Sequence, residues 1–358
     1  MNVVFGTLKV RKTTFTRKAG TTTGLTAGRG VWHDRLVGRT WSGRVGAVIA
    51  ALTLAAVSLT GCGPSFDGLH LRIAAGNSGG VYDKLGQTLA DAWAADLGID
   101  RPEVLKTQGS PDNVERVLSG GAEVAFVAAD VAADRAAAKP GLAALARIHD
   151  DYLHIVVRAD SDITKVDQLR GRTIGIGSPS SGVEYIAARL LTVAGLDNTV
   201  KKQNLGLDES VAKLLAGQID AFFWSGGLPT PSIANHNEQS TINGKSSLRL
   251  LDIADLMPKV QDASKVYSQV YGTATIPAST YNQPEPVTTL VVPNFLVVPA
   301  SMSADVAEAL VRGLFDARQQ LAVANPAALS IDVRPGIETQ PIPLHPGALR
   351  YYRAQKTS

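Results

Sequence analysis

Cysteine is almost absent from this chain of 358 residues, which contains one, and methionine is scarce at three. One cysteine excludes a disulfide framework within the chain and any zinc or iron–sulfur site built from several thiolates. Aromatic residues make up 6% and charged residues 19%, while hydrophobic residues reach 45%. Because this balance is that of a globular protein, disorder and a coiled coil are poor descriptions of the whole chain. At ~150 residues per domain, the length predicts about two domains.

Motifs for metals and cofactors are also incomplete. The histidines after Cys62 are scattered, with neither HxH nor HExxH spacing. The run from Gly175 to Ser180 approaches GxGxxG, but Pro179 interrupts it. The Walker-like Gly244-Lys245-Ser246 lacks its first glycine, because Gln239 occupies that position. The sequence therefore predicts no cofactor and no metal.

Positive charge is concentrated in the first part of the chain. Residues 1–61 contain nine Lys and Arg and one Asp, or 9 − 1 = +8. The remaining residues, 62–358, contain 35 − 9 = 26 basic and 32 − 1 = 31 acidic residues, or −5. Opposite charges predict different roles for the two parts. A net negative second part without a basic cluster predicts no nucleic-acid partner.

The basic part ends in an uncharged apolar stretch from Val45 to Gly61. It is shorter than the ~20 residues of a membrane span, and its layout is typical of a secretory signal peptide. Leu59-Thr60-Gly61-Cys62 resembles a bacterial lipobox, in which the cysteine is lipidated and becomes the N-terminus. We therefore predict a signal peptide at 1–61, a lipid-anchored linker at 62–68 and an extracytoplasmic protein held to the outer face of the cell membrane. A buried free thiol and an uncleaved N-terminal anchor are the alternatives.

The segment before Arg35 is long for the basic region of a signal peptide. We hypothesise that translation starts later, for example at Val37 read as an alternative start codon. A peptide from residues 1–30 in the unprocessed precursor would contradict this. Since no adjacent arginine pair precedes the apolar stretch, twin-arginine export is disfavoured.

After residue 68, strand and helix patterns alternate. Strands are expected at 69–75, 103–107, 123–128, 152–158, 173–177 and 219–224, and helices at 81–93, from 111 with Ser110 as N-cap, at 183–191 and at 208–217. This order predicts an α/β fold with a mixed, mostly parallel sheet. Leu118–Phe126 also matches Leu215–Phe223 at an offset of 97, which predicts two similar lobes. A common helix–turn–strand pattern without duplication is the alternative.

Two small-residue turns each follow a strand and open a helix. The candidate ligand-binding residues there are Asn77, Ser78, Gly79 and Gly80 in the first turn and Ser178, Ser180, Ser181 and Gly182 in the second. Exposed N–H groups and the positive end of the helix dipole meet at such turns and favour a carboxylate or phosphate oxygen. Two turns facing across a cleft would hold a small anion or zwitterion. Alternatively, Gly and Ser serve only as turn and cap residues.

Ser78 also lies in a GxSxG pattern between strand and helix, which is typical of a nucleophile elbow. A sheet and a histidine in the expected order are missing, because this strand would be the first of the domain. A secreted serine esterase using Ser78 is nevertheless kept as the alternative function. A lipoprotein with a purely structural or adhesive role is a second alternative.

Seven stretches carry a family resemblance across nearly the whole chain after Cys62. They are Gly79–Tyr82, Thr107–Asn113, Leu153–Ala159, Gly177–Gly182, Phe222–Pro231, Ile276–Tyr281 and Pro343–Tyr352. In these stretches the chain resembles the TAXI group (TRAP-associated extracytoplasmic immunogenic) of solute receptors, the binding subunits of tripartite ATP-independent (TRAP) transporters. The resemblance implies a non-enzymatic receptor that delivers an organic anion or amino acid, such as glutamate, to a TRAP-type permease driven by protons or sodium.

The resemblance further implies a two-lobed periplasmic-binding-protein (type II) fold with the ligand cleft between the lobes. The chain would form the first lobe at 69–158, the second at 159–292, and the rest of the first lobe with a C-terminal tail at 293–358. The crossings between lobes are expected near 158–162 and 290–294, where a few residues absorb closure.

Further binding residues are expected around this cleft. Ser110 and Asn113 lie at a third helix start. Tyr82 and Trp224 either cover the apolar part of the ligand or pack in the core. Ser225 and Gly226 adjoin Trp224 and are included for that reason. Asp130 either accepts a ligand ammonium or caps the following helix. Many relatives have Gln-Ser-Asp where this chain has Ala128-Ala129-Asp130. Since two polar groups near the cleft are missing, the identity of the ligand stays open.

Overall fold

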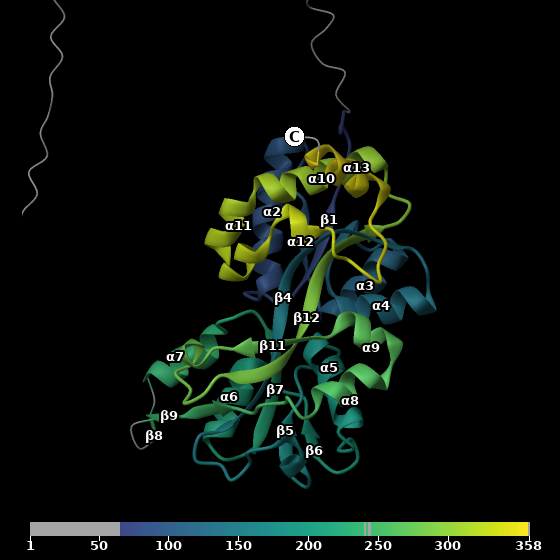
Figure 1. The fold of residues 1–358 in the computed structure, drawn as a ribbon. Helices are drawn as coiled ribbons and strands as arrows, with labels where there is room; N and C mark the ends of the chain where they lie inside the picture. Colours follow the sequence, from purple (N-terminus) through teal and green to yellow (C-terminus); the bar gives the residue numbers. More distant parts are fainter. Residues whose placement is uncertain (1–64, 240, 243–244, 357–358) are drawn as a thin grey trace, which may run out of the picture. The chain divides into compact units, whose positions relative to one another are not determined.

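Figure 1 shows a computed structural model that describes residues 65–239, 241–242 and 245–356. The chain divides into two compact units, Met1–Gly63 and Pro64–Ser358, and every described residue lies in the second. The predicted signal peptide and Cys62 lie outside the described residues. Within the described ranges, no helix is both long and apolar enough to cross a membrane.

Strands and helices alternate in the first half of this unit. The elements are β1 (Arg72–Gly76), α2 (Val81–Leu97), β2 (Glu103–Lys106), α3 (Ser110–Ser119), β3 (Val124–Ala128), α4 (Ala129–Ala138), β4 (Leu142–Arg158), η1 (Val166–Leu169), β5 (Thr173–Gly175), α5 (Gly182–Val193), β6 (Lys201–Gln203), α6 (Leu207–Leu215) and β7 (Ala221–Gly226). These confirm the predicted strands and helices. Strand β4 is much longer than predicted and begins at Leu142 rather than Tyr152.

The second half adds short helices and a second long strand. Its elements are α7 (Pro231–Gln239), β8 (Thr241–Ile242), β9 (Lys245–Ser246), β10 (Leu248–Leu250), α8 (Met257–Ala263), α9 (Lys265–Val270), β11 (Gly272–Ile276), η2 (Ala278–Thr280), β12 (Val287–Pro299), α10 (Ala304–Asp316), α11 (Arg318–Ala324), η3 (Pro326–Ser330), α12 (Val333–Gly336) and α13 (Pro346–Gln355). Helices α10 and α13 pack together, and α10 also contacts α2, so the end of the chain returns to its beginning.

The main sheet has the strand order β2-β1-β3-β12-β4-β7-β5-β6, with β10 beside β4 and β11 beside β12, and β8 and β9 form a separate pair. The pairs toward both ends are parallel, namely β1 with β2 and β3, and β5 with β6 and β7. The long strands β4 and β12 run side by side through the middle and pair antiparallel with each other and with their neighbours (Figure 1). The predicted α/β fold with a mixed sheet is confirmed.

The pairing of β4 with β12 contains a local irregularity. His149 lies opposite Asn294, and the next paired residue of β4 is Arg147 rather than Ile148. Ile148 is therefore an extra residue, and such a β-bulge re-aims the side chains around it. Beyond the bulge, alternate residues share a face, so His149 and Asp151 lie on the same side of β4.

The hydrophobic core follows the sheet. Trp93 and Leu296 belong to a cluster at the β1 end, and Phe222 and Leu250 belong to another at the β7 end. A third cluster includes residues from both ends and from the central strands, among them Phe295. This continuous apolar support on both sides of β4 and β12 holds the turns between strands and helices in place.

Candidate functional site

A cavity of about 190 Å³ lies where the turns after β1 and β5 meet strands β4 and β7. Its lining consists of Ala75, Gly76, Asn77, Gly80, Val81, Tyr82, Gln108, Gly109, Ser110, Ala128, Asp130, His149, Asp151, Gly177, Ser178, Ser181, Gly182, Val183, Ile186, Leu205, Gly206, Trp224, Ser225, Gly226 and Val292. Both small-residue turns of the sequence therefore line one cavity. Since pockets for drug-sized ligands are roughly 300–1,000 Å³, this volume fits a small solute.

Several helices begin at this cavity. Gly80, Gly109 and Gly206 are the N-caps of α2, α3 and α6, and none of them caps its helix with a side chain. In α5 the N-cap is Ser181, whose hydroxyl accepts a hydrogen bond from the Glu184 N–H at 3.1 Å. First-turn N–H groups have no partner within the helix and lie at the positive end of the helix dipole, so they attract an anionic oxygen.

The starts of α3 and α5 face each other closely. A Cβ added to Gly109 would lie 3.7 Å from the backbone nitrogen of Gly182, and one added to Gly182 would lie 3.8 Å from the Ser110 hydroxyl oxygen. Gly109 has a φ of 114°, a conformation that only glycine adopts easily. The absence of a side chain at these positions lets two helix N-termini approach the same small volume.

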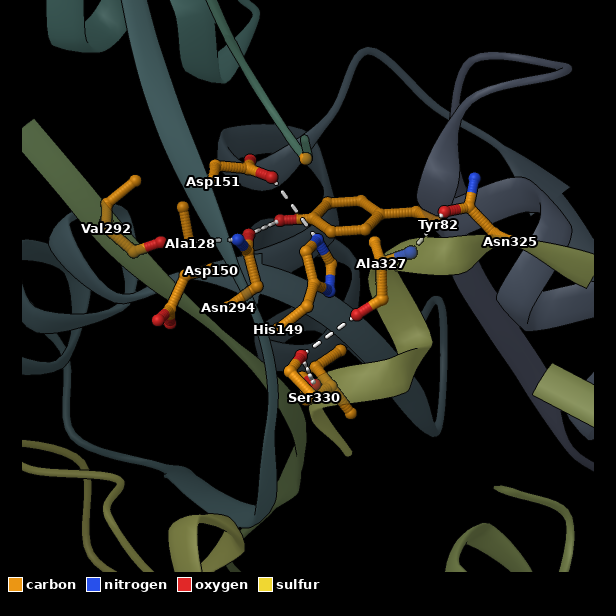
Figure 2. Close-up of polar contacts among 12 residues, drawn as sticks. Tyr82, Ala128, His149, Asp150, Asp151, Val292, Asn294, Asn325, Ala327 and Ser330 are labelled. Carbon is orange, nitrogen blue, oxygen red and sulfur yellow. Dashed lines mark hydrogen bonds and ion pairs between the residues drawn. The ribbon is translucent and has the colours of Figure 1, made fainter. Parts of the chain in front are cut away.

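Tyr82 forms one aromatic wall of the cavity. Its ring stacks on Phe126 with the centroids 5.3 Å apart, and its edge meets the ring of His149. Its hydroxyl donates to Asn294 Oδ1 in β12 (Figure 2). Burial, and then the charge of Asp151, raise the pKa of Tyr82 well above its ordinary value. The hydroxyl therefore stays protonated and ties the start of α2 to the central strand.

Trp224 forms a second aromatic wall. Its indole N–H donates to Thr230 Oγ1 at 3.1 Å, and the Thr230 N–H donates to the Tyr281 hydroxyl at 2.7 Å. The same hydroxyl lies 2.8 Å from His154 Nε2. Tyr82 and Trp224 each pack against the core and also line the cavity, and the predicted role of covering a ligand stays a prediction.

Asp130 lines the cavity, but its carboxylate already has partners. It accepts hydrogen bonds from the Val131 N–H at 2.8 Å and from the Tyr271 hydroxyl at 2.7 Å, and Arg189 Nη1 lies 3.6 Å away. Burial raises the pKa of Asp130, and the charge of Arg189 opposes that rise. The predicted capping role is wrong, because Asp130 lies inside α4, whose N-cap is Ala128 without a side-chain cap. The predicted role as acceptor of a ligand ammonium stays a prediction.

The sequence matches the NMT1-like family over residues 73–355, which is most of the chain. The chain belongs to the NMT1-like family. Because this membership is broader than the TAXI group, the narrower assignment stays a prediction.

Solved structures resemble this NMT1-like protein in fold. XAC2383 from Xanthomonas citri bound to chloride ion has a TM-score of 0.50 and 16% identity, over 80% of this chain and 99% of that chain. The periplasmic aliphatic sulphonate binding protein SsuA from Escherichia coli has a TM-score of 0.44 and 16% identity, over 80% and 82% of the two chains. The P235GK mutant of ArgBP from T. maritima has a TM-score of 0.43 and 14% identity, over 73% of this chain and 96% of that chain. At these identities the likeness concerns the fold alone.

Most of the predicted binding residues of this NMT1-like protein line the cavity. Those that do are Asn77, Gly80, Tyr82, Ser110, Asp130, Ser178, Ser181, Gly182, Trp224, Ser225 and Gly226. Ser78, Gly79, Ser180 and Asn113 lie outside this lining. The turn residues outside it still shape the helix starts, since the Gly79 N–H donates to Asp83 and the Ser180 N–H donates to Glu184.

Two predictions at the start of α3 need correction. Gly109, not Ser110, is the N-cap, and the Ser110 hydroxyl instead accepts from the Ala128 N–H at 3.0 Å. Asn113 is fully buried, and its amide donates to the Phe126 carbonyl at 2.7 Å. Asn113 therefore connects α3 with β3 and does not reach the cavity.

The geometry around Ser78 gives no support for the esterase alternative. Ser78 is exposed, and no histidine or carboxylate contacts its hydroxyl among the described residues. A serine nucleophile needs an adjacent base to activate it.

Sequence reasoning missed several lining residues, among them Gln108, His149, Asp151 and Gly206. Gly206 follows no distinctive motif. The signal for His149 and Asp151 was available, because they form a polar interruption within a buried strand. The sequence could not show that this interruption faces the cavity, since its direction depends on the bulge at Ile148.

Proposed function

We propose that this protein is an extracytoplasmic receptor that captures a small carboxylate or amino acid and delivers it to a TRAP-type permease. The observation that carries the proposal is the meeting of helix N-termini without side-chain caps in one small cavity. Such a site holds an anionic oxygen without a lysine or arginine. The choice of a TRAP-type partner rests on the resemblance of the sequence to TAXI receptors.

The two lobes are proposed to comprise 69–158 with 293–358, and 159–292. In this arrangement β4 and β12 connect the lobes and act as the hinge, since few residues are needed to absorb a closing motion. Gly109 and Gly182 would then come from opposite lobes. Closure would bring their helix starts onto the same ligand group.

Attachment to the membrane is proposed to depend on a lipid at Cys62. Replacing Cys62 with alanine is expected to move the protein from the membrane fraction to the soluble fraction, because the diacyl anchor supplies the two chains that stable attachment requires. Fractionation followed by immunoblotting measures this. A Cys62→Ala protein that stays with the membrane would contradict lipidation and favour an uncleaved apolar anchor.

Ligand capture is tested by thermal unfolding of the protein with amino acids, monocarboxylates, dicarboxylates and 2-oxo acids. A ligand present at about 100 times its Kd is expected to add about 2.7 kcal/mol to the free energy of unfolding. That gain raises the Tm by several degrees. No shift with any of these compounds at millimolar concentration would contradict the proposed function.

A pair of glycine variants localises the effect. Gly109→Ala is expected to remove the ligand-induced shift, because its backbone conformation is strained for alanine by about 1–3 kcal/mol and the start of α3 must move. Gly98→Ala is the control, since Gly98 also has a positive φ of 66° but ends α2 with no atom near its added Cβ. Equal loss of the shift in both variants would argue against a site at Gly109.

A further inference from the structure

Asp151 is a carboxylate that lines the cavity without a cationic residue to balance it. Its side chain is 16% exposed, and its contact in the described structure is His149, with Nε2 3.3 Å from Oδ1. The lining contains no lysine or arginine. Asp130, the other acid of the lining, differs because Arg189 and Tyr271 already compensate it. A carboxylate removed from most of the solvent is costly unless a cation or several donors satisfy it.

His149 adds an independent observation at the same place. Its side chain is 1% exposed and lines the cavity, yet neither ring nitrogen has a hydrogen-bond partner among the described residues. Buried polar atoms nearly always have a partner, so an unpartnered pair of ring nitrogens indicates a missing group. Figure 2 shows His149 beside the ring of Tyr82, with its contact to Asp151 dashed.

The charged residues next to His149 and Asp151 in the strand pair with one another and not with Asp151. Asp150, between the two residues, pairs with Arg147 at 2.8 Å, and Arg147 also pairs with Glu338 at 2.9 Å. The Tyr82 hydroxyl donates to Asn294 rather than to Asp151 (Figure 2). Since neighbouring residues of a strand point to opposite faces, Asp150 pairs with Arg147 on one side of β4, whereas Asp151 lines the cavity on the other without a cation.

We propose that Asp151 accepts the ammonium group of an amino acid, with an unprotonated ring nitrogen of His149 accepting a second hydrogen bond from the same group. This inference rests on the proposed function, because the helix N-termini hold the carboxylate of the same ligand. The ligand is therefore a zwitterion. A purely anionic dicarboxylate would place a second negative charge against Asp151 with no cation in the lining.

Isothermal titration calorimetry at neutral pH tests this with matched compounds that differ only in the amino group. The pairs are L-alanine with propionate, L-leucine with 4-methylpentanoate and L-glutamate with glutarate. The wild-type protein is expected to bind at least one amino acid about 10- to 100-fold more tightly than its partner, since a hydrogen bond to a charged group has that effect. Asp151→Asn is expected to remove this preference and His149→Gln to reduce it.

Asp150→Asn is the matched control, because Asp150 is adjacent in the same strand but pairs with Arg147, and it is expected to keep the preference. If the wild-type protein binds a carboxylate as tightly as its amino acid, the inference is overturned while the proposed function stands. Retention of the preference in Asp151→Asn also overturns it. If neither these compounds nor those of the thermal screen bind, the proposed function fails and the inference fails with it. The wild-type comparison decides the matter even if Asp151→Asn does not fold.

Discussion

Replacing Arg189 with methionine is expected to lower the free energy of unfolding by about 3 kcal/mol, because it leaves a buried carboxylate without its cation. Arg189 lies in α5, is 12% exposed, and contacts Asp130 at 3.6 Å and Asp134 more closely. Its guanidinium also lies over the ring of Tyr185, 4.0 Å from the centroid. Asp130 is only 2% exposed, so water cannot replace the lost partner. Urea denaturation at neutral pH measures the loss.

The compensating change identifies the cause. Asp130→Asn combined with Arg189→Met is expected to recover much of the lost stability, since no buried charge remains. Burial already raises the pKa of Asp130, and losing Arg189 raises it further. In Arg189→Met, Asp130 of the folded state then takes up a proton more readily than in the unfolded chain. The loss of free energy of unfolding therefore becomes smaller as the pH falls.

Arg312→Met is the matched control for Arg189→Met. Arg312 is exposed and pairs with Glu308 one helical turn away, so its loss is expected to cost less than about 0.5 kcal/mol. If Arg189→Met costs no more than Arg312→Met, the buried ion pair does not stabilise the contact between α4 and α5.

Lowering the pH from about 7 to 4 is expected to cost the protein about 3 kcal/mol through His154 alone. Burial lowers the pKa of His154 from 6.5 to about 4. Below its ordinary pKa the unfolded chain takes up a proton that the folded protein refuses, so stability present above about pH 6.5 is lost as the pH approaches 4. Since the Tyr281 hydroxyl connects His154 to Thr230 and Trp224, the loss should also loosen the cavity wall.

Comparison of two histidine variants isolates this contribution. His154→Gln cannot take up the proton, so its free energy of unfolding should fall less steeply between pH 7 and 4 than that of the wild type, by about 3 kcal/mol in total. His70→Gln is the control for the substitution itself, because the side chain of His70 is 78% exposed. Parallel pH curves for wild type and His154→Gln would contradict a buried neutral His154.

Much of the candidate site was predictable because the start of a helix is determined by residues that are close together in the sequence. A strand followed by Gly, Ser or Asn and then by helical spacing predicted both turns, and Gly80 and Gly182 line the cavity. The same reasoning failed for Asn113, whose amide bonds to β3 rather than to the cavity. Helical spacing predicts that Asn113 lies near the start of α3. It does not predict which neighbouring strand its side chain contacts.

The sequence by itself determined the α/β class, the order of most strands and helices, and the small-residue turns, because periodicity and capping depend on residues close in the chain. Tertiary structure alone decided which acid of the cavity lining is paired with an arginine and which is not. Asp130 is compensated by Arg189, which is distant in sequence, whereas Asp151 is turned into the cavity by a bulge against β12. The charge of a buried carboxylate depends on its neighbours in space, and strand pairing sets those neighbours.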